Sequence, residues 1–71
     1  MVNNQDEILT GQVIEALPNA MFKVDFMDDN EPEIVQLSGR MRRFRIRIFV
    51  GDKVEVKFDQ YGGRGIIIKR I

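Results

Sequence analysis

Five arginines fall within eight consecutive positions, residues 40–47, of a 71-residue chain whose formal net charge is zero. Each guanidinium is permanently charged, binds phosphate oxygens through parallel N–H donors, and can stack on the plane of a nucleobase. The alternative is a basic face that only keeps the protein in solution, but lysine would serve that purpose equally well. The cluster therefore favours a nucleic acid as the ligand.

The sequence offers little to catalysis or to metal binding. It contains no cysteine and no histidine, which leaves carboxylates and carbonyls as metal ligands and removes the usual acid–base group at neutral pH. The carboxylates show no spacing that selects a catalytic pair. We therefore expect no enzyme activity, no catalytic residue, no metal site and no cofactor.

Two further motifs have a structural interpretation. The acidic residues between positions 28 and 33 lack the ordered spacing and the glycine of a calcium loop, which indicates a solvated turn. The glycine-rich stretch at residues 62–65 lacks the Gly-Lys-Ser/Thr ending of a phosphate-binding loop. We expect this second stretch to be a hairpin loop that presents Arg64.

The charges are divided unequally along the chain. Residues 1–33 carry a net charge of −7 and residues 34–71 a net charge of +7, a division that points to a nucleic acid or a membrane. No apolar run approaches the roughly 20 residues needed to cross a bilayer, and the N-terminus does not have the pattern of a signal peptide. We therefore expect an intracellular protein with no membrane partner.

Short segments separated by turn residues predict an all-β fold. The expected strands are residues 10–16, 21–27, 33–37, 54–58 and 66–69, with apolar and polar residues alternating most clearly in the second and fourth. A five-stranded barrel of the OB type leaves no strand edge exposed. We expect this barrel to form one domain over residues 1–71, with residues 1–6 flexible.

The arginine cluster lies in a short insert after the third strand. Residues 40–44 predict at most one helical turn. In residues 45–48 arginine and isoleucine alternate, so both isoleucines can point inward only if both arginines point outward. Phe22, Phe26 and Phe58 are expected in the core. Phe44 either plugs one end of the barrel, the interpretation we favour, or stacks on an unpaired base.

Four collinear motifs give the chain a family resemblance. They are LPNAMFKV at residues 17–24, SGRMRR at 38–43, IRI at 46–48 and GDKV at 51–54. Together they resemble bacterial and plastid translation initiation factor 1. The resemblance covers most of the chain, and the sequence departs from the family pattern at Phe44, Arg45, Val50, Ile66 and Lys69.

The resemblance implies an S1-like OB barrel without catalytic activity. Such a factor binds the small ribosomal subunit at the decoding, or aminoacyl, site and contacts ribosomal RNA and a neighbouring ribosomal protein. It acts with initiation factors 2 and 3. We expect a monomer, in a bacterial cytoplasm or a plastid stroma.

The RNA-binding residues that we expect are mostly cationic and lie in the insert, on the outward face of the second strand and near the last strand. They are Lys23, Arg40, Arg42, Arg43, Phe44, Arg45, Arg47, Tyr61, Arg64 and Lys69. A general single-strand chaperone of the cold-shock type is the main alternative, but the chain has only six aromatic residues for its stacking platform. The same shortage counts against an SH3-like groove for proline-rich peptides.

Overall fold

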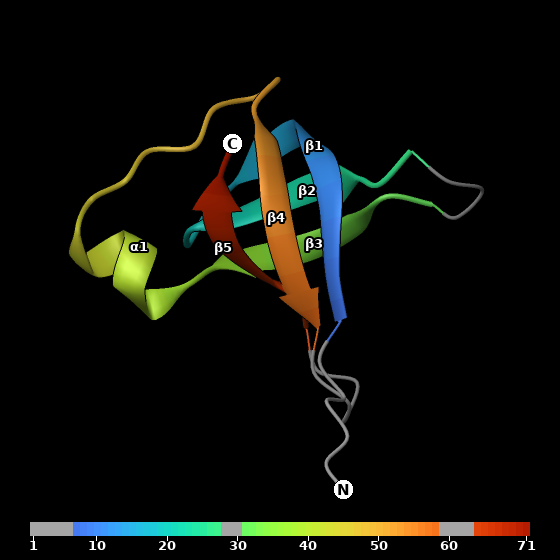
Figure 1. The fold of residues 1–71 in the computed structure, drawn as a ribbon. Helices are drawn as coiled ribbons and strands as arrows, with labels where there is room; N and C mark the ends of the chain where they lie inside the picture. The colour runs from blue at the N-terminus through green and yellow to red at the C-terminus, as the bar shows by residue number, and fades with distance from the viewer. Residues whose placement is uncertain (1–6, 28–30, 59–63) are drawn as a thin grey trace, which may run out of the picture.

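A computed structural model describes residues 7–27, 31–58 and 64–71, and within them it contains five strands and one short helix (Figure 1). In chain order these elements are β1 (Glu7–Leu17), β2 (Met21–Asp25), β3 (Glu33–Leu37), α1 (Gly39–Arg43), β4 (Lys53–Phe58) and β5 (Ile66–Arg70). The prediction that residues 1–6 are flexible lies outside the described residues.

The strands close into a barrel in the order β1-β2-β3-β5-β4. β3 and β5 are parallel, and all other neighbouring strands are antiparallel. β1 is long enough to pair with β4 through residues 7–12 and with β2 through residues 12–17. The predicted five-stranded barrel with a single helical turn after the third strand is confirmed.

The core fills the inside of the barrel with β-branched side chains, which pack well on a pleated surface. The most deeply buried side chains come from all five strands and are Val13, Val24, Val35, Val54, Val56 and Ile67. Phe22 is also buried, and Phe26 and Phe58 pack against this core and meet edge to face with ring centroids 5.7 Å apart. The prediction that these three phenylalanines belong to the core is confirmed.

A glycine allows β1 and β2 to approach each other closely. A Cβ atom added at Gly11 would lie 2.5 Å from Cγ1 of Val24 and 3.0 Å from the backbone oxygen of Asp25. The first distance would force the Val24 side chain to shift, and the second is tighter than most contacts of a real Cβ atom. Gly11 therefore sets the separation of the two strands on this side of the barrel.

Strand ends differ from the sequence prediction. β1 begins at Glu7 rather than at residue 10, because residues 7–9 pair with β4 as the barrel closes. Their side chains are largely exposed. Alternation of apolar and polar residues therefore could not predict that these residues form a strand. β2 ends at Asp25, two residues earlier than predicted, and β5 extends one residue further to Arg70.

The alternation in residues 45–48 does not form a strand. These residues are irregular, and Arg45 has a left-handed backbone with φ 56°. Ile48 is buried, whereas Ile46 is 38% exposed. The alternation read from the sequence therefore buries Ile48 but not Ile46, because the chain turns at Arg45 and has no neighbouring strand to fix a two-residue period.

Candidate nucleic-acid interface

The helix that carries the first arginines is short and firmly capped. Ser38 is its N-cap, and the side-chain oxygen of Ser38 accepts a hydrogen bond from the backbone N–H of Met41 at 3.1 Å. Such a cap satisfies one of the donors that a helix N-terminus leaves unpaired. Met41 is the buried residue of α1, so its side chain anchors the helix to the barrel.

The C-terminal end of α1 is closed by a Schellman motif. The backbone N–H of Ile46 donates to the carbonyl of Met41 at 3.0 Å, and that of Arg45 donates to the carbonyl of Arg42 at 3.1 Å. Arg45 occupies the left-handed position of this motif, which is usually taken by glycine. The motif turns the chain sharply and holds the arginines on both sides of the turn in a defined arrangement.

Phe44 does not plug the barrel, so the interpretation favoured from the sequence is wrong. Its side chain is 64% exposed, whereas Met41 is only 3% exposed and joins the core. Phe44 is the C-cap of α1, where the backbone leaves the helix with φ −92° and ψ 8°. The ring lies beside a guanidinium instead, with Cζ of Arg43 6.0 Å from its centroid.

The segment between α1 and β4 is held at a few points. Ile48 is buried in the core, and the guanidinium of Arg70 donates to the backbone carbonyl of Arg47 at 2.9 Å. A carboxylate oxygen of Asp52 accepts from the backbone N–H of Phe49 at 2.8 Å. Gly51 has φ 99°, which a residue with a side chain rarely adopts. The bond from Arg70 holds Arg47 at the end of β5, and the other contacts shape the turn at residues 49–52.

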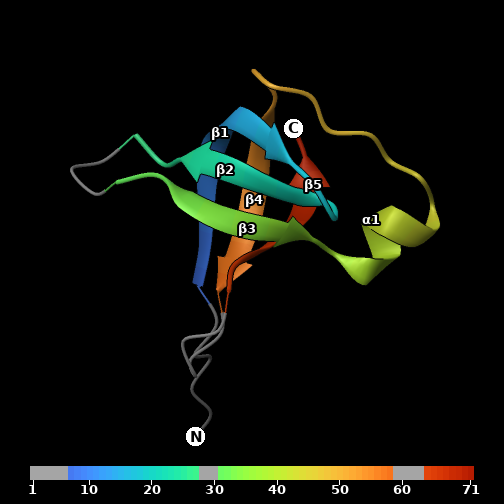
Figure 2. The same cartoon turned by 180° about the vertical axis from the view of Figure 1, so that it is seen from behind.

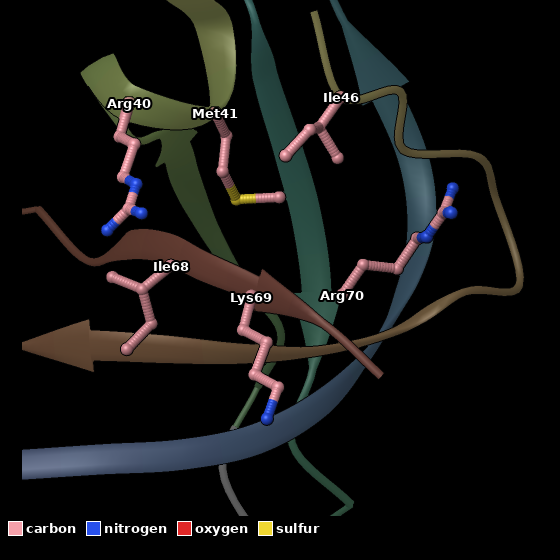
Figure 3. Close-up of a pocket in the computed structure, with 6 residues that line it drawn as sticks. All are labelled: Arg40, Met41, Ile46, Ile68, Lys69 and Arg70. Atoms are coloured by element: carbon pink, nitrogen blue, oxygen red, sulfur yellow. The ribbon is translucent and has the colours of Figure 1, made fainter. Parts of the chain in front are cut away.

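A hollow of about 450 Å³ lies where α1, the segment after it and β5 meet. Figure 3 shows its lining: Arg40 and Met41 of α1, Ile46, and Ile68, Lys69 and Arg70 of β5. The apolar side chains of Met41, Ile46 and Ile68 lie between the cations. Three positive charges around an apolar floor suit an anionic ligand that has flat apolar groups, such as a nucleotide.

The guanidinium groups of residues 40–47 are available to a ligand. All five arginines in this range are exposed. Within the described part of the chain, none of them forms an ion pair with a carboxylate. An exposed cation that is not paired with a carboxylate keeps its attraction for phosphate, because no internal negative charge competes with the ligand.

Acidic residues lie elsewhere on the barrel. Asp25 is the last residue of β2 and Glu33 the first residue of β3. Figures 1 and 2 both show the end of β2 and the start of β3 on the side of the barrel opposite to α1. These two carboxylates are therefore separated in space from the arginines of α1.

The structure brings together some of the predicted site residues and separates others. Arg40 and Lys69 line one hollow, and Arg42, Arg43, Phe44, Arg45 and Arg47 lie on α1 or the turn that follows it. Lys23 is half-buried on β2, and the exposed Arg64 donates to the sulfur of Met21 at 3.6 Å. Neither of these two residues lines the hollow, and Tyr61 lies outside the described residues.

Arg70 is a site residue that the sequence reasoning missed. It lines the hollow and binds the carbonyl of Arg47. Strict strand alternation places Lys69 and Arg70 on opposite faces, which hides their shared role. Both can reach the same hollow because β5 ends there. The two consecutive cations at the end of a strand are the signal that could have identified Arg70.

Two other kinds of site receive no support from the described residues. Residues 7–27, 31–58 and 64–71 contain no group of three or more acidic, cysteine or histidine side chains that could hold a metal ion. No helix in these ranges is long and apolar enough to span a membrane.

Comparisons with known proteins agree with this geometry. The family model for translation initiation factor 1A / IF-1 matches residues 1–71. Translation initiation factor IF-1 of Rickettsia akari (strain Hartford) is 43% identical over 70 residues, which cover 94% of this chain and 97% of that protein.

Solved structures match over most of the chain. The solution structure of translation initiation factor 1 from the Wolbachia endosymbiont strain TRS of Brugia malayi has a TM-score of 0.76 and 36% identity, and the match covers 94% of this chain and 79% of that one. The crystal structure of YjeQ from Thermotoga maritima has a TM-score of 0.73 and 28% identity, and the match covers 92% of this chain but only 23% of that longer one. The barrel is thus an OB fold, and this chain belongs to the translation initiation factor 1A / IF-1 family.

Proposed function

We propose that this chain binds the small ribosomal subunit at the decoding, or aminoacyl, site through ribosomal RNA and acts there with initiation factors 2 and 3. The observation that best supports the proposal is the hollow where Arg40 of α1 meets Lys69 and Arg70 of β5. The family to which the chain belongs is one of initiation factors and not of enzymes, which agrees with binding as the whole activity.

Phosphate contacts supply most of the affinity in this proposal. Each arginine that neutralises a phosphate releases condensed counterions, so the logarithm of the binding constant falls with the logarithm of salt concentration by about 0.7 per contact for single strands. Such contacts determine position and orientation rather than sequence. A factor that binds its RNA at one place on the ribosome does not need to recognise the RNA sequence.

Charge on the opposite side of the barrel would restrict how the protein docks. The hairpin that ends β2 with Asp25 and begins β3 with Glu33 carries negative charge, and phosphate repels it. The protein therefore contacts RNA with the side of the barrel that carries α1. While the factor occupies the aminoacyl site, it excludes tRNA from that site until the factor leaves.

The remaining partners follow from the same location. A protein at the decoding site also contacts a neighbouring ribosomal protein. We expect it to act as a monomer in the compartment that holds these ribosomes, a bacterial cytoplasm or a plastid stroma.

Retention on purified small subunits tests the role of the arginines. We expect the double variant Arg42→Ala plus Arg47→Ala to bind more weakly than wild type. The salt slope, which is the steepness with which the logarithm of the binding constant falls against the logarithm of salt concentration, should be lower by about 1.4. The double variant Lys53→Ala plus Lys57→Ala removes the same charge from β4, outside the arginine cluster, and serves as the matched control. Equal retention of wild type and the arginine variant would contradict the assigned role.

Chemical probing of small-subunit RNA tests the location. We expect protection by the wild-type protein to concentrate at the decoding region. Tight binding to oligonucleotides of mixed sequence, without localised protection on the subunit, would favour the cold-shock type of chaperone instead.

A further inference from the structure

The exposed ring of Phe44 has no structural task in the barrel. Three other phenylalanines are used in packing: Phe22 is buried, and Phe26 and Phe58 pack against the core. Met41 fills the position under α1 that Phe44 could have filled. Phe44 remains 64% exposed at the end of the helix.

The backbone nevertheless holds this ring in a defined place. The N–H of Phe44 donates to the carbonyl of Arg40 at 3.0 Å, and the next two N–H groups make the hydrogen bonds of the Schellman motif. Phe44 itself has φ −92° and ψ 8°. The ring is thus presented from a closed turn, which lowers the entropic cost of binding a ligand.

One guanidinium group lies over the ring, and other arginines are its neighbours in the sequence. Cζ of Arg43 lies 6.0 Å from the ring centroid, and Arg42 and Arg45 are exposed on either side along the chain. Cations beside an open aromatic face favour a ligand that is both flat and anionic. A nucleotide in a single-stranded stretch of RNA has both properties, because the base can stack while its phosphates meet the guanidinium groups.

We propose that Phe44 is a stacking site for an unpaired base of RNA, separate from the hollow between α1 and β5. The inference rests on the proposed function for the identity of that RNA, the ribosomal RNA of the small subunit. Stacking tolerates any base, because every base has a π face. Phe44 therefore adds affinity without sequence preference and holds the strand against the arginines.

The test compares full-length wild type with Phe44→Leu and Phe49→Leu. Leucine keeps an apolar side chain but lacks the aromatic face. Phe49 is the matched control, since it is also exposed, at 56%, and lies in the turn that Asp52 caps. Thermal unfolding followed by circular dichroism should be nearly the same for all three proteins, because both rings are largely outside the core.

Binding is measured on purified small subunits and on a short single-stranded RNA that contains 2-aminopurine, whose fluorescence falls on stacking. We expect Phe44→Leu to bind at least about fivefold more weakly than wild type in both assays. It should quench the probe less and leave the salt slope unchanged, because no phosphate contact is lost. Phe49→Leu should behave as wild type.

The outcomes separate this inference from the proposed function. Wild type and Phe44→Leu that bind and quench equally would overturn the stacking site only. Wild type that fails to bind small subunits would overturn the proposed function, while the oligonucleotide assay would still decide whether Phe44 stacks on a base. An equal loss of affinity in Phe49→Leu would also overturn the inference, because it would show that removing any exposed aromatic ring weakens binding.

Discussion

The barrel and the segment of residues 38–52 are built by different means. In the barrel, each strand pairs with two neighbours and contributes deeply buried β-branched side chains. In residues 38–52, the chain is held by helix caps, by single hydrogen bonds such as that from Arg70 to Arg47, and by the buried Met41 and Ile48. Five exposed arginines belong to this second region, all of them within residues 40–47.

The difference shows how a small domain can separate stability from binding. A chain of this size has a free energy of unfolding of roughly 4–10 kcal/mol, so few core contacts can be given up. The barrel supplies this stability through the side chains that its strands bury. The segment of residues 38–52 adds little core and presents charge, and its geometry depends on a handful of hydrogen bonds.

The largest effect is expected from a cavity in the barrel. Ile67→Ala removes a side chain that is fully buried and should lower the free energy of unfolding by about 2–5 kcal/mol. Ile66→Ala, on the next residue of β5 and 41% exposed, should lower it by less than about 1 kcal/mol. Urea denaturation followed by circular dichroism measures both. Similar losses in the two variants would contradict the assignment of inward and outward faces.

A smaller loss is expected where two strands approach closely. Gly11→Ala places a methyl group against Val24 and the backbone of Asp25 and should lower the free energy of unfolding by about 1–3 kcal/mol. Gly39→Ala, at the start of α1, meets nothing within 4 Å and should leave stability unchanged or raise it by up to about 1 kcal/mol. The same denaturation experiment compares them, and a destabilised Gly39→Ala would show that residues 38–52 are packed as tightly as the barrel.

The smallest effect, of opposite sign, is expected in the Schellman motif. Arg45 has a left-handed backbone, which costs a residue with a side chain about 1–2 kcal/mol. Glycine removes this backbone strain, but part of the gain is offset because glycine also has more conformational freedom in the unfolded chain. Arg45→Gly should therefore raise the free energy of unfolding by about 0.5–1 kcal/mol.

The same variant should bind RNA less well. Loss of one guanidinium is expected to lower the salt slope of small-subunit binding by about 0.7. Arg45→Lys keeps both the charge and the backbone strain, so its stability should match wild type and its salt slope should be unchanged. A gain in stability without any loss of binding would show that the side chain of Arg45 has no part in the interface.

Much of the barrel could be predicted from local pattern. A strand places alternate side chains on opposite faces, so Val54 and Val56 on one face and Lys57 on the other identify a half-buried strand without knowledge of its partner. Turn residues at Pro18 and Asn19 separate two such strands. The arginine cluster is also a property of the sequence alone, because its five members are close neighbours in the chain.

Contacts between distant residues could not be predicted in this way. Met41 rather than Phe44 enters the core because the orientation of α1 is set by its packing on the barrel. The alternation in residues 45–48 has no strand beside it, since a helix cap turns the chain at Arg45.

The candidate site also has some features that the sequence determines and others that depend on the tertiary structure. The sequence determined that this chain has strands enough for a small barrel and a dense group of cations after the third of them. Only the tertiary structure decided that Arg40 shares a hollow with Lys69 and Arg70. The physical reason is that periodicity records which side of its own backbone a residue occupies, whereas a binding surface depends on which chain segments the closed barrel brings together.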